Sequence, residues 1–544
     1  MSFHFDPLKK KFQPEHILCP KCNKVVDLPS SYLGIIQCSN TDCGNIFIHN
    51  QIRINHLEVP QSCSYDQVIC PLTGGGLQGC LGLDWNQYGG NSNRTFCLAD
   101  SLGAFGKPNT QEYLFLDKFK KTEVVPQERP DILHLNSVRG QLLCTTKDGM
   151  IYRYHHILEH PDDWIKMNTI SCDFTSTYGN SIEVKYSPAF SIDKNKQVFS
   201  LTLFDQANLH QNLPLLFRSF HLEDKNISAV NKTIPPKNGC KWLSAPLLIE
   251  KGIQPIFAVW QGRFEKYKIV DDELVFFTVD GEEIGRVETN TVRPPVYNSD
   301  LDAFLIFDGN RIKKMRMLKY NLIDNHIKTN FHDIDINIPR VYLHETSQPL
   351  FVLIKTISNQ FELWGVNKHH HTGKVQICKF IFTQSQQILK YEVQMSFFKE
   401  TNIPFEDITG VSVGYSSLYQ KEHYVTQLAV STLNRGVYVF SKSDPDSSFK
   451  NVVPVRSLRG DIVGMSSPPI ITPAAIIFSM ADNLKLSSDF GWKYTDKLAK
   501  YYIKSRDAFA YGHGLCILGK RIFTGDGKNV LCYDIQLKNY VNQN

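Results

Sequence analysis

One pattern of residues recurs along this chain from about residue 130 to its C-terminal end. A small or proline-containing step leads into a short apolar strand, a turn of Gly, Asp or Asn follows, and a second strand with alternating apolar residues comes next. The clearest copies lie at 142–152, 187–199, 244–248, 294–312, 349–353, 428–440, 467–478 and 522–533. Most neighbouring copies are about 45 to 58 residues apart, and helical periodicity is scarce. The chain is therefore predicted to be a repeat protein built mainly of β-strands.

This spacing is the one expected for the blades of a β-propeller. A blade is a four-stranded antiparallel sheet that cannot bury both of its faces alone, so blades stack around an axis. The step Ser/Ala-Pro-apolar, followed by apolar-x-Asp-Gly-x-apolar, resembles the quinoprotein-like (PQQ-like) propellers. It resembles the WD40 propellers less, because no Gly-His and Trp-Asp pairs mark the blades. We expect seven or eight blades; several β-sandwich domains are the alternative, which the regular period disfavours.

One interval of the repeat is longer than the others. Residues 361–428 exceed the period and contain His369, His370 and His371. We expect either an inserted loop or a further blade in this interval, with the three histidines in an exposed loop.

Four cysteines near the N-terminus have the spacing of a structural zinc site. Cys19 and Cys22 form a Cys-x2-Cys pair, and Cys38 and Cys43 form a looser Cys-x4-Cys pair. Zn²⁺ takes four tetrahedral ligands, and two cysteines separated by two residues form a tight turn whose thiolates converge on one ion. A module this small buries too little apolar surface to fold without a metal. Four free thiols or a redox pair are the alternatives, but a redox Cys-x-x-Cys is expected to open a helix within a βαβ pattern.

The residues around these cysteines resemble a zinc ribbon. Apolar stretches at 25–28, 33–37 and 46–48 are predicted to be its strands. The resemblance implies that all four cysteines bind one structural Zn²⁺, although the longer second pair departs from the commonest ribbon. Because residues 1–62 carry six basic and five acidic side chains, a structural or protein-docking ribbon is favoured over one that binds nucleic acid. We divide the chain into a lead-in (1–16), a zinc ribbon (17–50), a linker (51–64) and a β-propeller (65–544).

A second group of cysteines follows the ribbon. Cys63, Cys70, Cys80 and Cys97 are too unevenly spaced to predict a second metal site, so buried free thiols are the favoured interpretation. The glycine-rich run 73–79 is predicted to be a turn, since no Gly-Lys-Ser/Thr follows it as in a phosphate-binding loop.

No catalytic motif was found in the sequence. There is no HExxH, no GxSxG and no kinase signature. The pairs 162–163 and 271–272, each Asp-Asp, are predicted to be solvated loop tips. His155, His156 and His160 would share a face only on a helix, so a metal site there is not favoured. Dehydrogenases among the quinoprotein-like propellers are exported, and no export signal is visible here, so the chain is predicted not to be an enzyme.

Charge and hydropathy indicate the compartment and the partners. A formal charge of +5 over 544 residues gives no reason to expect a polyanion. The basic stretch 311–319 interleaves apolar and charged residues and is predicted to be a solvated blade edge. The longest apolar run, 468–481, is shorter than the roughly 20 residues that span a bilayer and is interrupted by Pro473. We therefore expect a cytoplasmic protein without a membrane segment.

These observations favour a non-enzymatic scaffold or recognition subunit that binds protein partners in a multi-subunit complex through the propeller. A zinc ribbon fused to a propeller also resembles the propeller components of bacterial conflict (defence) systems. The first alternative is a nucleic-acid-associated factor that uses the ribbon and the basic blade edge. The second alternative is an enzyme that uses the central funnel of the propeller.

Overall fold

The computed structural model describes short strands between residues 4 and 48, Gln87 and Gly90, and, with gaps, residues 112–539. The described part consists of β-strands and one 3₁₀ turn, η3 (Phe405–Asp407). The prediction of a mainly β protein is confirmed. Among the described residues, no helix has the length and apolar character needed to cross a membrane.

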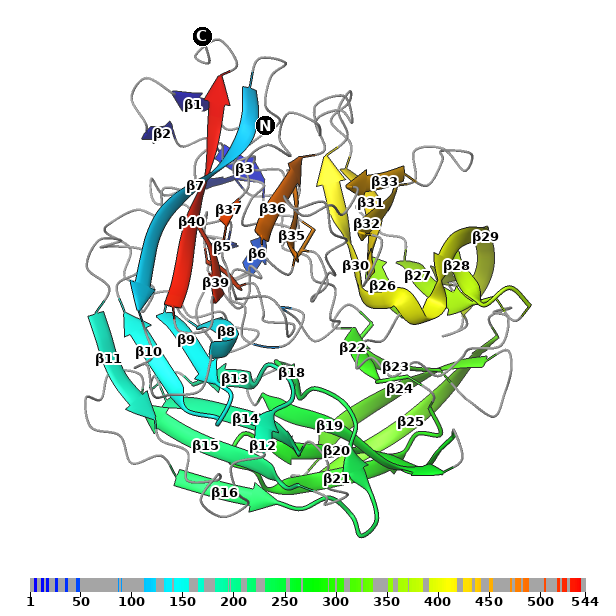
Figure 1. Ribbon diagram of the computed structural model, residues 1–544. Coiled ribbons are helices and arrows are strands. Elements are labelled where there is room, and N and C mark those ends of the chain that lie inside the picture. Colours follow the sequence, from blue (N-terminus) through cyan, green and yellow to red (C-terminus); the bar gives the residue numbers. More distant parts are fainter. Residues whose placement is uncertain are drawn as a thin grey trace.

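Among the described strands, eight antiparallel sheets of four or five strands are arranged around a common centre (Figure 1). The first four sheets contain β8 (Ile132–Val138), β9 (Gln141–Thr146), β10 (Ile151–His155) and β11 (Ile165–Ile170); β12 (Ile182–Val184), β13 (Ala189–Ile192), β14 (Gln197–Gln206), β15 (Leu215–His221) and β16 (Val230–Ile234); β17 (Lys241–Trp242), β18 (Leu247–Ile249), β19 (Ile256–Glu265), β20 (Lys268–Thr278) and β21 (Glu283–Glu288); and β22 (Val296–Asn298), β23 (Ala303–Phe307), β24 (Lys314–Ile323) and β25 (His326–Asp335).

The other four sheets complete the circle. They contain β26 (Phe351–Lys355), β27 (Phe361–Lys368), β28 (Lys374–Gln384) and β29 (Tyr391–Pro404); β30 (Ile408–Ser417), β31 (Tyr424–Thr432), β32 (Gly436–Ser441) and β33 (Lys450–Val453); β34 (Ile470–Ile471), β35 (Ala475–Met480), β36 (Asn483–Ser488) and β37 (Ile503–Lys504); and β38 (Cys516–Leu518), β39 (Arg521–Gly525), β40 (Asn529–Asn539) and β7 (Glu112–Glu123).

The innermost strands show that this circle is a β-propeller. Strand β18 contacts β13 on one side and β22 on the other. In the same way β22 contacts β26, β26 contacts β30, and β30 contacts β34. Strand β38 contacts β8, the first strand of the first sheet. The last sheet receives its fourth strand from the N-terminal side, because β40 pairs with β7 from Asn539 opposite Glu112 to Asn529 opposite Glu123. The ring is therefore closed by hydrogen bonds between the two ends of the propeller (Figure 1).

Alternation along the strands explains how each sheet serves two neighbours. Successive side chains of a strand point to opposite faces of its sheet. In β19, Phe257 and Val259 pack toward the β12–β16 sheet, whereas Ala258 and Trp260 pack toward the β22–β25 sheet. Both faces are buried, and this is why the inner strands read as continuous apolar runs rather than as alternating ones.

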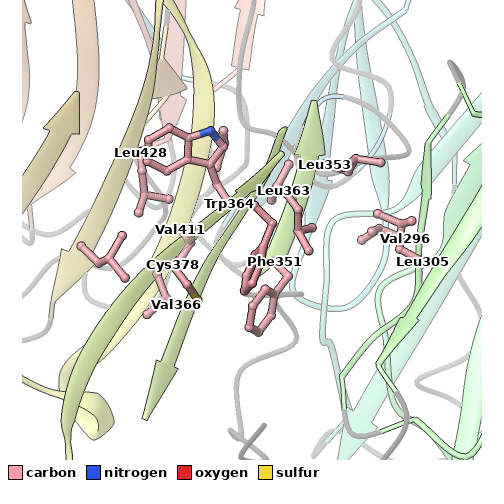
Figure 2. Close-up of a cluster of buried hydrophobic side chains, with 14 of the residues drawn as sticks. Val296, Leu305, Phe351, Leu353, Leu363, Trp364, Val366, Cys378, Val411 and Leu428 are labelled. Atoms are coloured by element: carbon pink, nitrogen blue, oxygen red, sulfur yellow. The ribbon is translucent and has the colours of Figure 1, made fainter. Parts of the chain in front are cut away.

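The largest described core joins the β22–β25, β26–β29 and β30–β33 sheets (Figure 2). Figure 2 shows Leu363 on the side of Val296, and Trp364 on the side of Leu428. Gly365 lies between Trp364 and Val366, where a Cβ atom would come within 2.1 Å of the Phe351 ring. Only glycine fits this close approach of two strands.

The same core contains a buried ion pair. Lys379 Nζ lies 2.5 Å from Glu362 Oε1, and the two side chains are 1% and 10% exposed. Trp364 Nε1 donates to Glu362 Oε2 at 3.0 Å, and the ammonium lies 5.1 Å from the centre of the Trp364 ring. The charges are therefore satisfied locally, as buried charges must be.

The long interval 361–428 contains strands rather than an inserted loop. Its residues supply β27 to β29 of one sheet and β30 with the start of β31 of the next. The copy identified at 428–440 starts on the second strand of its sheet, so the sequence pattern missed the first, β30. Measured between first strands, from Phe351 to Ile408, the interval fits the repeat.

Candidate interaction surface

The ring has two faces, which are formed by the ends of its strands. We call the face at which the innermost strands begin the start face. The turns between the second and third strands of the sheets lie on this same face, because neighbouring strands run in opposite directions. They include the turns at 146–150, 265–268 and 369–373. The amide of Phe405, which leads into β30, donates to the carbonyl of Gly373 at 3.0 Å. This bond ties the turn of one sheet to the beginning of the next.

The β19–β20 hairpin carries an exposed aromatic residue to this face. Its two strands remain paired to the tip, where Phe264 lies opposite Ile269 and Glu265 opposite Lys268. The Phe264 side chain is 57% exposed, the most of any large apolar residue in the described part of the chain. Single exposed apolar side chains are common on protein surfaces, but this one is held on a paired strand and is therefore available for contact in a fixed position.

A bulge at Gly262 sets the direction of the hairpin tip. The register shifts between Gln261 and Arg263. A Cβ atom on Gly262 would lie 2.8 Å from Cγ2 of Ile269 and 3.0 Å from Cδ1 of Leu243, so glycine is required for the close packing. Bulges of this kind commonly re-aim a strand end near a functional surface.

Ion pairs form at the same hairpin tip. Arg263 Nη2 lies 2.9 Å from Asp271 Oδ2 and 2.9 Å from Glu265 Oε1. Because all three side chains are about half exposed, these pairs contribute little to stability. Arg263 and Glu265 flank Phe264 in the strand, so the tip carries an apolar side chain on one face and charged side chains on the other.

Asp272 corrects one prediction from the sequence. The Asp271–Asp272 pair was expected at a solvated loop tip, whereas both residues lie within β20 and only Asp271 is solvated. Asp272 is 2% exposed. Its Oδ2 accepts hydrogen bonds from Trp260 Nε1 at 3.1 Å, from the Thr291 amide at 3.0 Å and from the Thr289 hydroxyl. The carboxylate therefore anchors the base of the hairpin to the segment that leads into β22. The other acidic pair, at 162–163, lies outside the described residues.

The histidine-rich turn, predicted to be an exposed loop, lies on the start face; His369 is half-buried, and His370 lies outside the described residues. His371 is exposed, and the Nδ1 of His369 lies 2.9 Å from the Thr372 hydroxyl, which donates to Glu400 Oε1 at 2.7 Å. Within the described residues, no group of three or more His, Cys, Asp or Glu side chains could hold a metal ion. His155 ends strand β10, so the helical arrangement considered for it is absent; His156 and His160 lie outside the described part.

The predicted zinc ligands Cys19, Cys22, Cys38 and Cys43 lie outside the described residues, but the strands around them are described. They are β3 (His16–Leu18), β4 (Val25–Asp27), β5 (Ile35–Gln37) and β6 (Ile46–Ile48), and they follow β1 (His4–Asp6) and β2 (Lys11–Gln13). Strand β3 pairs with β4, and β5 pairs with β6. Each cysteine pair therefore falls in the connection of a two-stranded hairpin. The sequence predicted β4, β5 and β6 and missed β3. The cysteines at 63, 70, 80 and 97 are also outside the described residues.

The basic stretch 311–319 is not a blade edge. Its described part belongs to β24, which is hydrogen-bonded to β23 on one side and to β25 on the other. In this register Lys314 lies opposite Asp335, and Arg316 lies opposite Asp333. The prediction was wrong because an inner strand whose partner strand carries acidic residues shows the same alternation of apolar and charged residues as an edge strand. The sequence of the strand alone does not distinguish the two.

Side chains also cover polar groups on the inner edges of the ring, and no sequence pattern predicted them. Gln87 is 3% exposed; its Oε1 accepts from the Leu248 amide at 2.9 Å, and its Nε2 donates to the Leu248 carbonyl at 3.1 Å. One side-chain amide thus pairs with the free edge of β18 as a neighbouring strand would. Asn298 Nδ2 similarly donates to the Leu353 carbonyl of β26 at 2.8 Å.

Comparison with known proteins gives similar structures and no family. No family model matches the chain, and no curated protein matches it by sequence. The chain is similar to the quinohemoprotein alcohol dehydrogenase of Comamonas testosteroni, with 9% identity, coverage of 84% of this chain and 81% of that one, and a TM-score of 0.44. It is similar to alcohol dehydrogenase ADHIIG of Pseudomonas putida HK5, with 9% identity, the same coverages and a TM-score of 0.40. Drosophila semaphorin 1a, extracellular domains 1 and 2, matches with 7% identity over 69% of this chain and 88% of that one, with a TM-score of 0.34.

These likenesses concern the fold, and the strand pairing described above establishes the propeller on its own. They also correct one prediction. The sequence led us to expect that the chain is not an enzyme, whereas two of the similar structures are alcohol dehydrogenases and therefore enzymes. That expectation is withdrawn.

Proposed function

We propose that this chain is a recognition subunit whose propeller binds a protein partner in a multi-subunit cytoplasmic complex. The observation that carries the proposal is Phe264, an aromatic side chain 57% exposed at the tip of a paired hairpin on the start face. Exposed aromatic residues within a polar rim are the usual anchors of protein interfaces. The partner would present an apolar pocket for the ring.

The rigidity of the scaffold supports this role. The eight described sheets are, in our proposal, the eight blades of the ring. Each shares its buried faces with its neighbours, so a hairpin on one blade is held by the whole ring. A preorganised surface loses little conformational entropy when it binds, which favours affinity.

Replacing Phe264 by Asp should strongly weaken partner binding and leave folding intact. Truncating an aromatic anchor costs about 2 kcal/mol or more, which is a loss of roughly 30-fold in affinity. The hairpin tip is solvated, so the thermal unfolding temperature should stay near that of the wild type. The measurement is quantitative recovery of the proteins that co-purify with the tagged full-length chain from its native source.

A second exposed phenylalanine provides the matched control. Phe331 lies on β25 opposite Leu318 and is 38% exposed. Phe331→Asp should retain the co-purifying proteins. Equal recovery from the Phe264→Asp chain and the wild type would contradict the proposed surface.

We also propose that residues 17–50 form a zinc ribbon in which Cys19, Cys22, Cys38 and Cys43 bind one structural Zn²⁺. Two features support this proposal. Thiolates are preferred ligands of zinc, and the two paired hairpins, β3–β4 and β5–β6, each connect through one cysteine pair.

Replacing Cys22 by Ser should lower the zinc content of the purified chain from one ion to well below one. The ribbon should unfold locally, because its folding free energy comes from the metal, while the main thermal transition of the propeller stays unchanged. Metal analysis after gel filtration, together with calorimetry, measures both effects. Replacing Cys144, which is buried in the propeller and far from the ribbon in sequence, by Ser should leave the zinc content at one. Loss of the ribbon and the propeller in a single transition would refute the independence of the two modules.

A further inference from the structure

The innermost strand β18 has an edge that faces the centre of the ring (Figure 1). Among the described strands, β18 is hydrogen-bonded only to β19, with Leu248 opposite Phe257. In an antiparallel pair, the N–H and C=O groups of one residue point together, either toward the partner strand or away from it. Both groups of Leu248 are hydrogen-bonded to Gln87. They therefore lie on the edge of β18 that faces away from β19 and toward the centre.

Gln87 reaches this edge from outside the eight sheets, because it precedes β7, which begins at Glu112. Its side chain is 3% exposed, accepts from the Leu248 amide at 2.9 Å and donates to the Leu248 carbonyl at 3.1 Å. The Gly90 amide donates to the Gln87 carbonyl at 2.9 Å, which closes a four-residue turn. We call this turn, residues 87–90, the plug.

Inner edges of other sheets are covered by residues of the ring itself. Asn136 of β8 donates through Nδ2 to the Ser187 hydroxyl at 3.0 Å, just before β13 of the next sheet. Asn298 of β22 donates to the Leu353 carbonyl of β26, also in the next sheet. At β18 the amide comes instead from Gln87, which belongs to no sheet of the ring. The contact at β18 can therefore open without breaking any strand pair of the propeller.

The edge that Gln87 covers is of a kind that binds other protein segments. The N–H and C=O groups on the edge of a strand form a template for a second chain. A side-chain amide offers one donor and one acceptor, as a peptide group does, so Gln87 imitates one residue of an added strand. Departure of Gln87 provides the space that another amide of the same size needs.

We propose that the inner edge of β18 is a binding site for a protein segment that presents a side-chain amide in a turn, and that the plug is its built-in competitor. The plug keeps the site closed, and a segment from a partner binds there by displacing Gln87. This proposal does not depend on the surface around Phe264. The appropriate probe is a synthetic peptide with the sequence of residues 83–95, since it contains the turn that the structure shows at this edge.

The test measures fluorescence anisotropy of the labelled peptide with the full-length wild type, Gln87→Ala and Asn298→Ala. The wild type should bind weakly, because its own plug competes at an effective concentration that is roughly millimolar. Gln87→Ala should bind about tenfold more tightly or better, because the resident plug has lost both of its hydrogen bonds to Leu248. Asn298→Ala loses a contact within the ring and keeps the plug, so it should bind as the wild type does.

Two further measurements distinguish a displaceable plug from a part of the core. Thermal unfolding of Gln87→Ala should begin only slightly below that of the wild type, because every strand pair is intact. Hydrogen exchange at β18 should be faster in Gln87→Ala and slow again when the peptide is added. Equal peptide affinity in all three proteins, or no binding to Gln87→Ala, would overturn the proposal. A Gln87→Ala chain that fails to fold would also overturn it, since Gln87 would then be an obligatory part of the propeller.

Discussion

Deletion of residues 529–539, which form β40, should unfold the entire propeller and not only its last sheet. Without β40, strand β7 has no partner in the last sheet, and β39 loses the strand next to it. The ring then opens, and the apolar faces on both sides of the gap meet water. A domain has only about 5–15 kcal/mol of stability in total, so losing an 11-residue strand and ring closure together exceeds what the fold can tolerate.

Hydrogen exchange followed by mass spectrometry measures this outcome. Amides on distant sheets, such as those of β19 and β27, should lose protection together with those of β38 and β39. A chain that lacks only residues 540–544, which follow β40, should behave as the wild type. Protection lost in the last sheet alone would show that the sheets form an open stack rather than a closed ring.

Replacement of Lys379 by Met should cost about 3–5 kcal/mol, the largest effect expected from a single substitution here. The variant leaves Glu362, which is 10% exposed, as a buried carboxylate whose remaining donor among the described residues is Trp364 Nε1. Urea unfolding monitored by tryptophan fluorescence gives the free energy of unfolding, and the fluorescence of Trp364 itself reports on the site.

The double variant Lys379→Met with Glu362→Leu provides the matched comparison. When both charges are removed, the desolvation cost disappears with the attraction, so the double variant should be close to the wild type in stability. If the double variant is as unstable as Lys379→Met alone, the loss comes from packing and the ion pair is not its cause.

The sequence predicted the propeller because its strongest signals are local. Runs such as Leu247–Ile249 are apolar at every position, and the structure explains them by burial against a neighbour on each face. Turns such as Lys147-Asp148-Gly149 could be predicted because the turn requires a backbone conformation that favours glycine. The φ of Gly149 is 86°.

The polar interior could not be predicted in the same way. The Asp271–Asp272 pair reads as a solvated turn, and only Thr289 and Thr291 on another segment show that Asp272 is buried. The contact of Gln87 with Leu248 joins residues 161 apart, and no local pattern encodes it. Arg293 precedes two prolines and resembles an exposed turn, yet it is fully buried and lies near Phe405 of a distant segment. In each case the deciding partner comes from a distant part of the chain.

The pairing of β7 with β40 also sets the order of events during synthesis. Strand β7 ends at Glu123, and its partner begins at Asn529, so more than 400 residues must be made between them. At about 5–20 residues per second, β7 waits roughly 20 to 80 s on the ribosome with an unpaired edge. Such an edge can pair with a second nascent chain, and we therefore expect this protein to depend on chaperones that bind the growing chain until its last strand is released.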